Sequence, residues 1–243
     1  MGNLSIAKKF SLIATIVTVL MLIIGYLILN KYKNDLTLEV YTGVKNELNN
    51  LSDLKIKSKF DVGISNAISI SNDAKIQEAL KENNRNLAKE ALSSLSINMK
   101  KSTPFKNIKV HIHTKDTKSF LRSWKPEKFD DDLKSFRKSV LKVNTNNIAV
   151  NTFEVGKAGL SIRAVVPIFD SMSNTHLGSL EFMQGINSVA KSFDKTGDAF
   201  LLLMNSSVSI SNINDNKRLQ NYVISQKFIN NDLVQDSKTI DFN

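Results

Sequence analysis

An unbroken apolar run near the amino terminus constrains this chain more than any other feature. Residues 10–29 contain no charged side chain, while Lys8 and Lys9 precede the run and Lys31 and Lys33 follow it. At a rise of about 1.5 Å per residue, a helix of about twenty residues spans about 30 Å, the thickness of the hydrocarbon core of a bilayer. We therefore predict that residues 1–30 form a short cytoplasmic segment and a transmembrane helix.

A cleavable signal peptide is the alternative interpretation of this run. Its apolar core would be shorter, about 7 to 15 residues, and a small-x-small cleavage site would follow. Neither feature occurs here, so we expect a retained anchor in the inner (cytoplasmic) membrane. Lysines flank both ends, but Lys8, Lys9 and the amino terminus favour a cytoplasmic N-terminus, which places the bulk of the chain in the periplasm. Without a second such run before Asn243, the chain as given is single-pass, or the front part of a longer protein.

Composition excludes several kinds of site and partner. Cysteine is absent, so there is no disulfide framework, thiolate metal site or cysteine nucleophile. The net charge of +10 is concentrated between Lys101 and Lys142. Such a surface suits an anionic ligand or a phospholipid surface, although a solvated lysine-rich surface is the simpler interpretation. We expect no nucleic-acid partner, because a translocated domain would not meet one.

Two long helices are predicted for residues 31–103, which we interpret as a helical stalk. Residues 31–71 contain no proline and no glycine cluster, and apolar residues recur there at three- and four-residue intervals, the spacing of one helical face: Val40, Val44, Leu48, Leu51 and Leu54. Asn72 and Asp73 are suited to cap a second helix over residues 72–101. Its stripe comprises Ile76, Leu80, Leu87, Ala91, Leu95 and Met99, and Pro104 should end it.

The period changes from 3.6 to 2 after residue 104. Ile108, Val110 and Ile112 alternate with Lys109, His111 and His113, which predicts a half-buried strand with the histidines facing outward. Further strands are expected at residues 160–166, 177–183 and 199–204. Asp130, Asp131 and Asp132 should open a helix that runs to residue 143, since carboxylates are favoured at a helix N-terminus. A shorter helix is expected at residues 188–195, ended by Gly197.

These elements predict an α+β fold in which a PAS-like antiparallel sheet packs on the helical stalk. Several segments then resemble the Cache-type sensor region of bacterial methyl-accepting chemotaxis receptors, in particular the double-Cache class also found on sensor histidine kinases. They are HIHT (111–114), SFLRSW (119–124), DDL (131–133), FR (136–137), EVGKAGLSIR (154–163), VPI (166–168) and LGSLEF (177–182). The resemblance covers the anchor and residues 31–205, and it implies a Cache sensor domain at residues 104–205. Residues 206–243 match loosely and are interpreted as the truncated start of a second, membrane-proximal sensor subdomain.

The resemblance implies a ligand-sensing input module of a transmembrane chemoreceptor, which binds a small molecule outside the cytoplasm and transmits the signal through membrane helices. The chain lacks a second membrane helix, a HAMP relay and the methylated coiled coil of the full receptors. The sensory half of a histidine kinase or cyclase therefore remains an alternative, as does a membrane-anchored structural or adhesive domain without ligand. Related receptors are parallel helical dimers, so we also expect a homodimer formed through the apolar stripe of residues 40–54.

Candidate ligand-binding residues lie in the matching segments. Two guanidiniums and an indole on the concave side of a sheet would hold a small anion, because arginine makes bidentate contacts with carboxylates and tryptophan covers an apolar body. Pairing of Arg163 with Glu181 on the neighbouring strand is the structural alternative. The predicted ligand, an organic acid or an amino acid, would contact Arg122, Trp124, Arg163, Ser161, Glu181 and His113.

Metal binding and catalysis are not expected. His111 and His113 share a strand face, and with His176 they would supply enough imidazoles for zinc or copper. However, a surface strand places polar side chains outward without any ligand, and no carboxylate stands at a tight spacing beside them. The residues 130–132 lack the spaced oxygen ligands of a calcium loop. No nucleophile elbow, P-loop, HExxH or dinucleotide fingerprint occurs, so we predict no cofactor and no enzyme.

Overall fold

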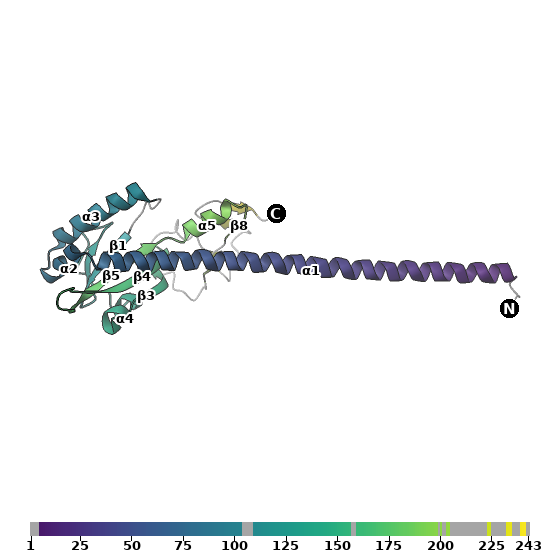
Figure 1. Ribbon diagram of the computed structural model, residues 1–243, viewed down its shortest axis with the longest axis horizontal. Helices are drawn as coiled ribbons and strands as arrows, with labels where there is room; N and C mark the ends of the chain where they lie inside the picture. Colours follow the sequence, from purple (N-terminus) through teal and green to yellow (C-terminus); the bar gives the residue numbers. More distant parts are fainter. Residues whose placement is uncertain are drawn as a thin grey trace. The chain divides into compact units, whose positions relative to one another are not determined.

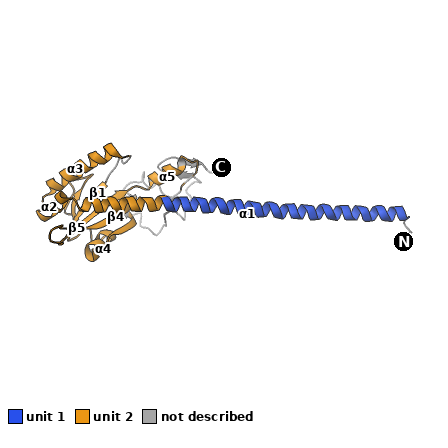
Figure 2. Ribbon diagram, viewed as in Figure 1, with its two compact units in different colours: residues 1–54 blue, residues 55–243 orange. Residues whose placement is uncertain are grey.

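A single long helix begins the described structure. The computed structural model describes residues 5–103, 109–156, 159–198, 200, 203–204, 223–224, 232–234 and 239–241. Helix α1 (Ile6–Ser71) has 66 residues and divides between two units, residues 1–54 and 55–243 (Figures 1 and 2). Among the described residues, α1 is the one helix long and apolar enough to cross a membrane, and its apolar side chains between residues 10 and 29 are exposed. The helix predicted for residues 31–71 is confirmed.

Two shorter helices replace the single one predicted for residues 72–101. Asp73 caps α2 (Ala74–Lys81), as predicted, by accepting hydrogen bonds from the main-chain amides of Lys75 and Ile76. The chain then turns at Asn83, which has a left-handed φ of 53°, and Asn84 caps α3 (Arg85–Ser102). The prediction of one continuous helix was wrong because two consecutive asparagines supply a left-handed turn and a new N-cap. Pro104, predicted to end this helix, lies outside the described residues.

Five antiparallel strands form the main sheet, in the order β2-β1-β5-β4-β3. The strands are β1 (Lys109–Thr114), β2 (Ser119–Arg122), β3 (Val150–Gly156), β4 (Gly159–Phe169) and β5 (His176–Gln184). The strands predicted at residues 160–166 and 177–183 are confirmed as β4 and β5. The strand predicted to begin at Ile108 is confirmed as β1, although Ile108 itself lies outside the described residues. The α+β fold class is confirmed, whereas β2 and β3 were not predicted.

Shorter elements complete the described chain. α5 (Asn187–Asp194) confirms the helix expected at 188–195. Of the strand expected at 199–204, the structure describes β6 (Leu203–Met204), which pairs in parallel with β7 (Val223–Ile224). β8 (Asp232–Val234) and β9 (Thr239–Asp241) form an antiparallel pair. Most of residues 206–243, including the predicted second subdomain, lies outside the described residues.

The helix predicted for residues 130–143 was wrong in its start. α4 spans Lys138–Asn146, and Asp130 and Asp131 form ion pairs with arginines of other elements. Asp130 accepts from Arg85 of α3 at 2.6 Å, and Asp131 accepts two hydrogen bonds from Arg122 of β2. Charged partners on other elements therefore determine the conformation of this aspartate run, in place of a helix dipole.

The sheet has one apolar and one polar face. Helices α1, α2 and α3 cover the apolar face, where their buried residues pack against alternate strand residues in one core: Ala67, Ile70, Ile76, Ala79, Ala88, Leu92, Val110, Ile112, Ala164, Val166, Leu180 and Phe182. On the opposite face, α4 packs Val140 and Val143 against Val165 of β4. Successive strand residues point to opposite faces, so the residues between the core positions lie beneath α4.

Candidate functional site

Ionisable side chains gather on the face of the sheet that α4 covers. The register sets His111 of β1 opposite Glu181 of β5, and Glu181 opposite Val165 of β4. His111, His113, Arg163 and Glu181 are each at most 3% exposed. These four residues, together with Arg137 and Glu154, are called the polar cluster below. Charged groups are rarely buried unless they are paired, so their partners define the chemistry of this face.

Glu181 is the centre of the polar cluster. Its Oε1 accepts hydrogen bonds from Nη1 of Arg163, at 2.7 Å, and from Nη2 of Arg137. Arg137 directly precedes α4 and also donates to Oε2 of Glu154, an oxygen that accepts from Ser139 at 2.6 Å as well. Two carboxylates and two guanidiniums thus balance their charges in the interior, as buried ions must.

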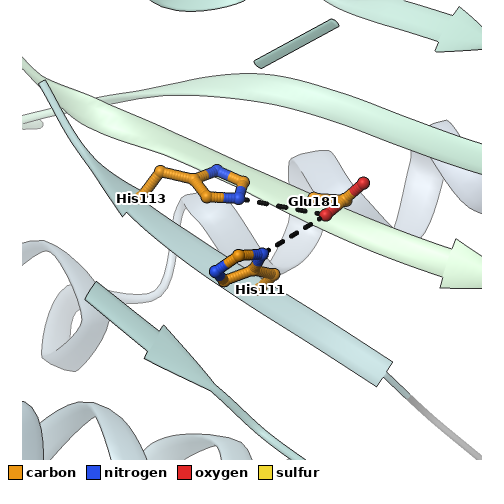
Figure 3. A group of neighbouring side chains, drawn as sticks. All are labelled: His111, His113 and Glu181. Atoms are coloured by element: carbon orange, nitrogen blue, oxygen red, sulfur yellow. Dashed lines mark ion pairs between the residues drawn. The ribbon is translucent and has the colours of Figure 1, made fainter. Parts of the chain in front are cut away.

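The second carboxylate oxygen of Glu181 faces the two histidines (Figure 3). Oε2 lies 3.5 Å from Nδ1 of His111 and 3.9 Å from Nε2 of His113. The other nitrogen of each ring has a serine partner: Nε2 of His111 lies 2.8 Å from Oγ of Ser119, and Nδ1 of His113 lies 3.1 Å from Oγ of Ser179. These serines hold both rings with the remaining nitrogens directed toward Glu181.

Burial and neighbouring charges fix the protonation of this group. Burial alone would raise the pKa of Glu181, but the charges of Arg163 and Arg137 hold it well below its usual value. Burial lowers the pKa of His111 to about 4, against the opposing effect of the neighbouring Glu181 carboxylate. Burial likewise lowers the pKa of His113 well below 6.5. Near neutral pH the group therefore consists of a carboxylate and two neutral imidazoles.

Arg122 and Trp124 lie at the border of the polar face. Arg122 is opposite His111 in the register, and its guanidinium is bound by both oxygens of Asp131, at 2.8 and 2.7 Å, and by the carbonyl of Lys128. Trp124 is 41% exposed, and its ring meets His111 edge-on with the centroids 5.8 Å apart. Trp124 also lines a surface groove along α3, together with Lys100 and Lys109.

The predicted site residues are partly brought together. His113, Arg163 and Glu181 meet in the polar cluster, and the alternative pairing of Arg163 with Glu181 is the one present. Ser161 lies on the same face, opposite Glu154, and its buried hydroxyl has no hydrogen-bond partner. Arg122 and Trp124 stand apart from Glu181. Whether these residues bind a ligand stays a prediction.

The interpretation of His111 and His113 as outward-facing surface residues was wrong. Both rings are buried because the second face of the sheet is also covered: α4 packs on β4 and β5, and Arg137 before it binds Glu181 beside the histidines. His176 lies elsewhere, beside Phe169. Sequence reasoning also missed Arg137 and Glu154 as members of the cluster. A signal was present in Glu181, the one carboxylate of β5, which lies between Leu180 and Phe182 and needs a charged partner when buried.

Comparison with known proteins places the chain in a sensor family. Residues 45–239 match the family dCache_3, described as the double sensory domain of two-component sensor kinases, and the chain belongs to this family. The Cache-type sensor predicted from sequence is therefore confirmed, whereas a methyl-accepting chemoreceptor in particular is not. No curated protein matches the chain.

Two solved sensor domains are distantly similar. The E. coli DcuS sensor domain has 13% identity and a TM-score of 0.41, over 56% of this chain and 97% of that one. A domain of a sensory box/GGDEF family protein from Vibrio parahaemolyticus has 16% identity and a TM-score of 0.36, over 60% of this chain and 58% of that one. Both similarities are too distant to indicate what this chain binds.

Proposed function

We propose that this chain is the non-catalytic, extracytoplasmic input module of a membrane sensor protein, in which a small molecule bound to the α4 side of the sheet changes the position of α1. Membership of the double sensory family is the observation that carries this proposal. The buried ionisable groups on one sheet face support it, because a stable core does not require them and convergent polar groups are typical of ligand sites.

The strands offer a direct connection between this face and α1. β5 carries Glu181 on the polar face and Gln184 three residues later on the opposite face, where its side-chain amide donates to the carbonyl of Lys59 in α1 at 2.7 Å. On β4, Arg163 faces the cluster, and its neighbour Ala164 lies against Gly63 of α1. A ligand that moves β4 or β5 would therefore act on α1 directly.

The description of the matched family favours a sensor kinase as the output. A methyl-accepting chemoreceptor is the second candidate, which rests on the sequence resemblance of segments such as residues 111–114 and 177–182. In either case we propose that residues 10–29 anchor the chain in the inner membrane, with the sensor domain in the periplasm.

An organic acid or an amino acid remains the proposed ligand class. The arginines that would bind its carboxylate already have protein partners, so the ligand would exchange with Asp131 at Arg122 or with Glu181 at Arg163. Such an exchange alters contacts between strands, which is what a sensor requires.

Thermal shift measurements on the full chain in detergent micelles, with a library of organic acids and amino acids, test this proposal. A ligand should raise the unfolding midpoint of the wild type, and Arg122→Gln should weaken its binding, measured by calorimetry, at least tenfold. Lys57→Gln, at an exposed pair with Asp61, is the matched control and should bind like the wild type. If no compound stabilises the wild type, the proposed ligand class is wrong.

A further inference from the structure

Of the buried side-chain atoms in the polar cluster that have no hydrogen-bond partner, two face each other. They are Oε2 of Glu181 and Nε2 of His113, which lie 3.9 Å apart. This distance is too long for a hydrogen bond, and buried polar atoms nearly always have a partner. Nδ1 of His111 lies 3.5 Å from the same oxygen. Three atoms that can bind a metal ion therefore lie within 4.8 Å of one another.

We propose that His111, His113 and Glu181 bind one divalent transition-metal ion, with Zn²⁺ as the best match. The donors would be Nδ1 of His111, Nε2 of His113 and Oε2 of Glu181, all within 4.8 Å of one another (Figure 3). Two imidazoles and one carboxylate form a known zinc donor set, and imidazole favours transition metals over calcium or magnesium. This site goes beyond the proposed sensor function and does not depend on it.

The separations of the donors are close to those of a zinc site. With bonds of about 2.0 to 2.2 Å and tetrahedral angles, two ligands of zinc lie about 3.4 Å apart. The two separations from Oε2 of Glu181 are 3.5 and 3.9 Å. Side-chain rotations that move these atoms by less than about 1 Å would bring both separations to that value.

Each proposed ligand also has the outer contact that metal ligands require. Histidine ligands usually bind a second group through the nitrogen that does not bind the metal, and carboxylate ligands are hydrogen-bonded in turn. Here Ser119 and Ser179 occupy the outer nitrogens of His111 and His113. On Glu181, Arg137 and Arg163 both bind Oε1 and leave Oε2 free for the metal.

The polar cluster has no net charge before a metal binds, and a neutral site can still hold a divalent cation. Glu181 and Glu154 balance Arg137 and Arg163, so a bound metal would add uncompensated positive charge. Zinc sites built from three neutral imidazoles carry a comparable charge and complete their coordination with water or hydroxide. The site therefore needs no further acidic residue, although a solvent ligand would fill the fourth position.

Direct binding measurements test the proposal, and the composition of the chain makes them simple. The full chain contains three histidines and no cysteine, so it should be purified in detergent through a tag without histidine and treated with a chelator. Zn²⁺ or Co²⁺ is then added and equilibrated. With ¹⁵N-labelled histidine, two of the three imidazole signals should shift at one equivalent of Zn²⁺, and bound Co²⁺ should give the visible absorption of a four- or five-coordinate ion.

Variants identify the ligands and control for adventitious binding. His111→Gln and His113→Gln should each weaken Zn²⁺ binding at least tenfold, whereas His176→Gln should bind like the wild type because His176 lies outside the cluster. The labelled wild type decides the question even if a variant fails to fold. The proposal is overturned if the wild type binds neither ion, if one equivalent of Zn²⁺ shifts the His176 signal alone, or if His176→Gln alone abolishes binding.

Discussion

The side-chain amide of Gln184 donates a hydrogen bond to the main-chain carbonyl of Lys59 at 2.7 Å, and so joins β5 to α1. Gly63 makes this contact possible, because a Cβ at that position would lie 2.6 Å from the amide nitrogen of Gln184. Gln184 is three residues from Glu181 on the same strand. The polar cluster and α1 are therefore connected through one short segment of β5.

Loss of the Gln184 contact should loosen α1 from the sheet. We expect Gln184→Ala to lower the free energy of unfolding by about 1 kcal/mol, the net value of one hydrogen bond, and to speed amide hydrogen exchange around residues 59–63. Asn151→Ala is the matched control, since Asn151 also donates to α1, at Phe60, but over 3.4 Å and from an exposed position. Equal exchange in both variants would show that the Gln184 bond has no special role.

Removal of Arg163 should destabilise the empty domain. Arg163→Ala leaves Glu181 buried with only Arg137 on Oε1, and breaking a buried ion pair costs about 3 to 5 kcal/mol. Chemical denaturation should show this loss, and a second change, Glu181→Gln, should recover part of it by removing the buried charge. Lys57→Ala, in an exposed pair, should cost less than about 1 kcal/mol. An unchanged midpoint for Arg163→Ala would contradict the internal pairing.

Periodicity predicted the elements whose pattern is unambiguous. The apolar stripe of residues 40–54 and the alternation in β4 and β5 each identified an element of the right type. β2 was missed because Ser119–Arg122 is four residues long, and β3 was missed because Val150–Gly156 is an edge strand whose alternation lacks a clear apolar side. The start of α4 was placed wrongly because the bonds of Asp130 and Asp131 to distant arginines are not visible in local sequence.

The sequence predicted some residues of the candidate site, but few of the contacts between them. Alternation along β4 and β5 correctly placed Arg163 and Glu181 on one face, and their pairing was considered. Arg137 could not be found in this way because it lies outside any strand and reaches Glu181 only when α4 covers the sheet. For the same reason a half-polar strand was interpreted as exposed, and His111 and His113 were placed in solvent.

Acid should weaken the turn after β4 through Asp170. Hydrogen bonds from Ser173 and Lys81 lower the pKa of Asp170 from 3.8 to about 2. Because the folded-state pKa lies below the unfolded one, the stabilisation is complete above about pH 4 and is lost as the pH falls toward about 2. Asp170→Asn should thus lower the urea midpoint at neutral pH, and its difference from wild type should shrink across that window. Asp61→Asn, at an exposed pair, should show little difference at either pH.

The proposed membrane anchor at residues 10–29 predicts the topology of the chain. Residues 10–29 are apolar and exposed in α1, so the chain should remain in the membrane fraction and resist carbonate extraction. Protease added to intact spheroplasts should digest the bulk of the protein, because the proposed topology places the residues after 30 in the periplasm. As a control, a cytoplasmic marker protein must stay intact. Release of a soluble mature form, or complete protection from protease, would contradict this topology.

The apolar stripe of α1 predicts that two copies of the chain associate through it. Val40, Val44 and Leu54 are 57%, 51% and 65% exposed, and these side chains would be buried in a parallel pair of helices. The chain has no native cysteine, so single cysteines report directly on this contact. Val44→Cys should cross-link between chains in the membrane, whereas Asn46→Cys, two residues on and about 200° around the helix, should not.

Replacing Val44 and Leu48 together by Asp places like charges on the same helical face, four residues apart. Two copies of this variant would bring four carboxylates together at the contact, so the dimer fraction should fall, as measured by light scattering or by cross-linking through a cysteine at position 40. Asp at positions 42 and 46 adds the same charge to the opposite face and should leave the dimer intact. If cysteines along the stripe never cross-link, or if both charge variants weaken association equally, the stripe is not the dimer contact.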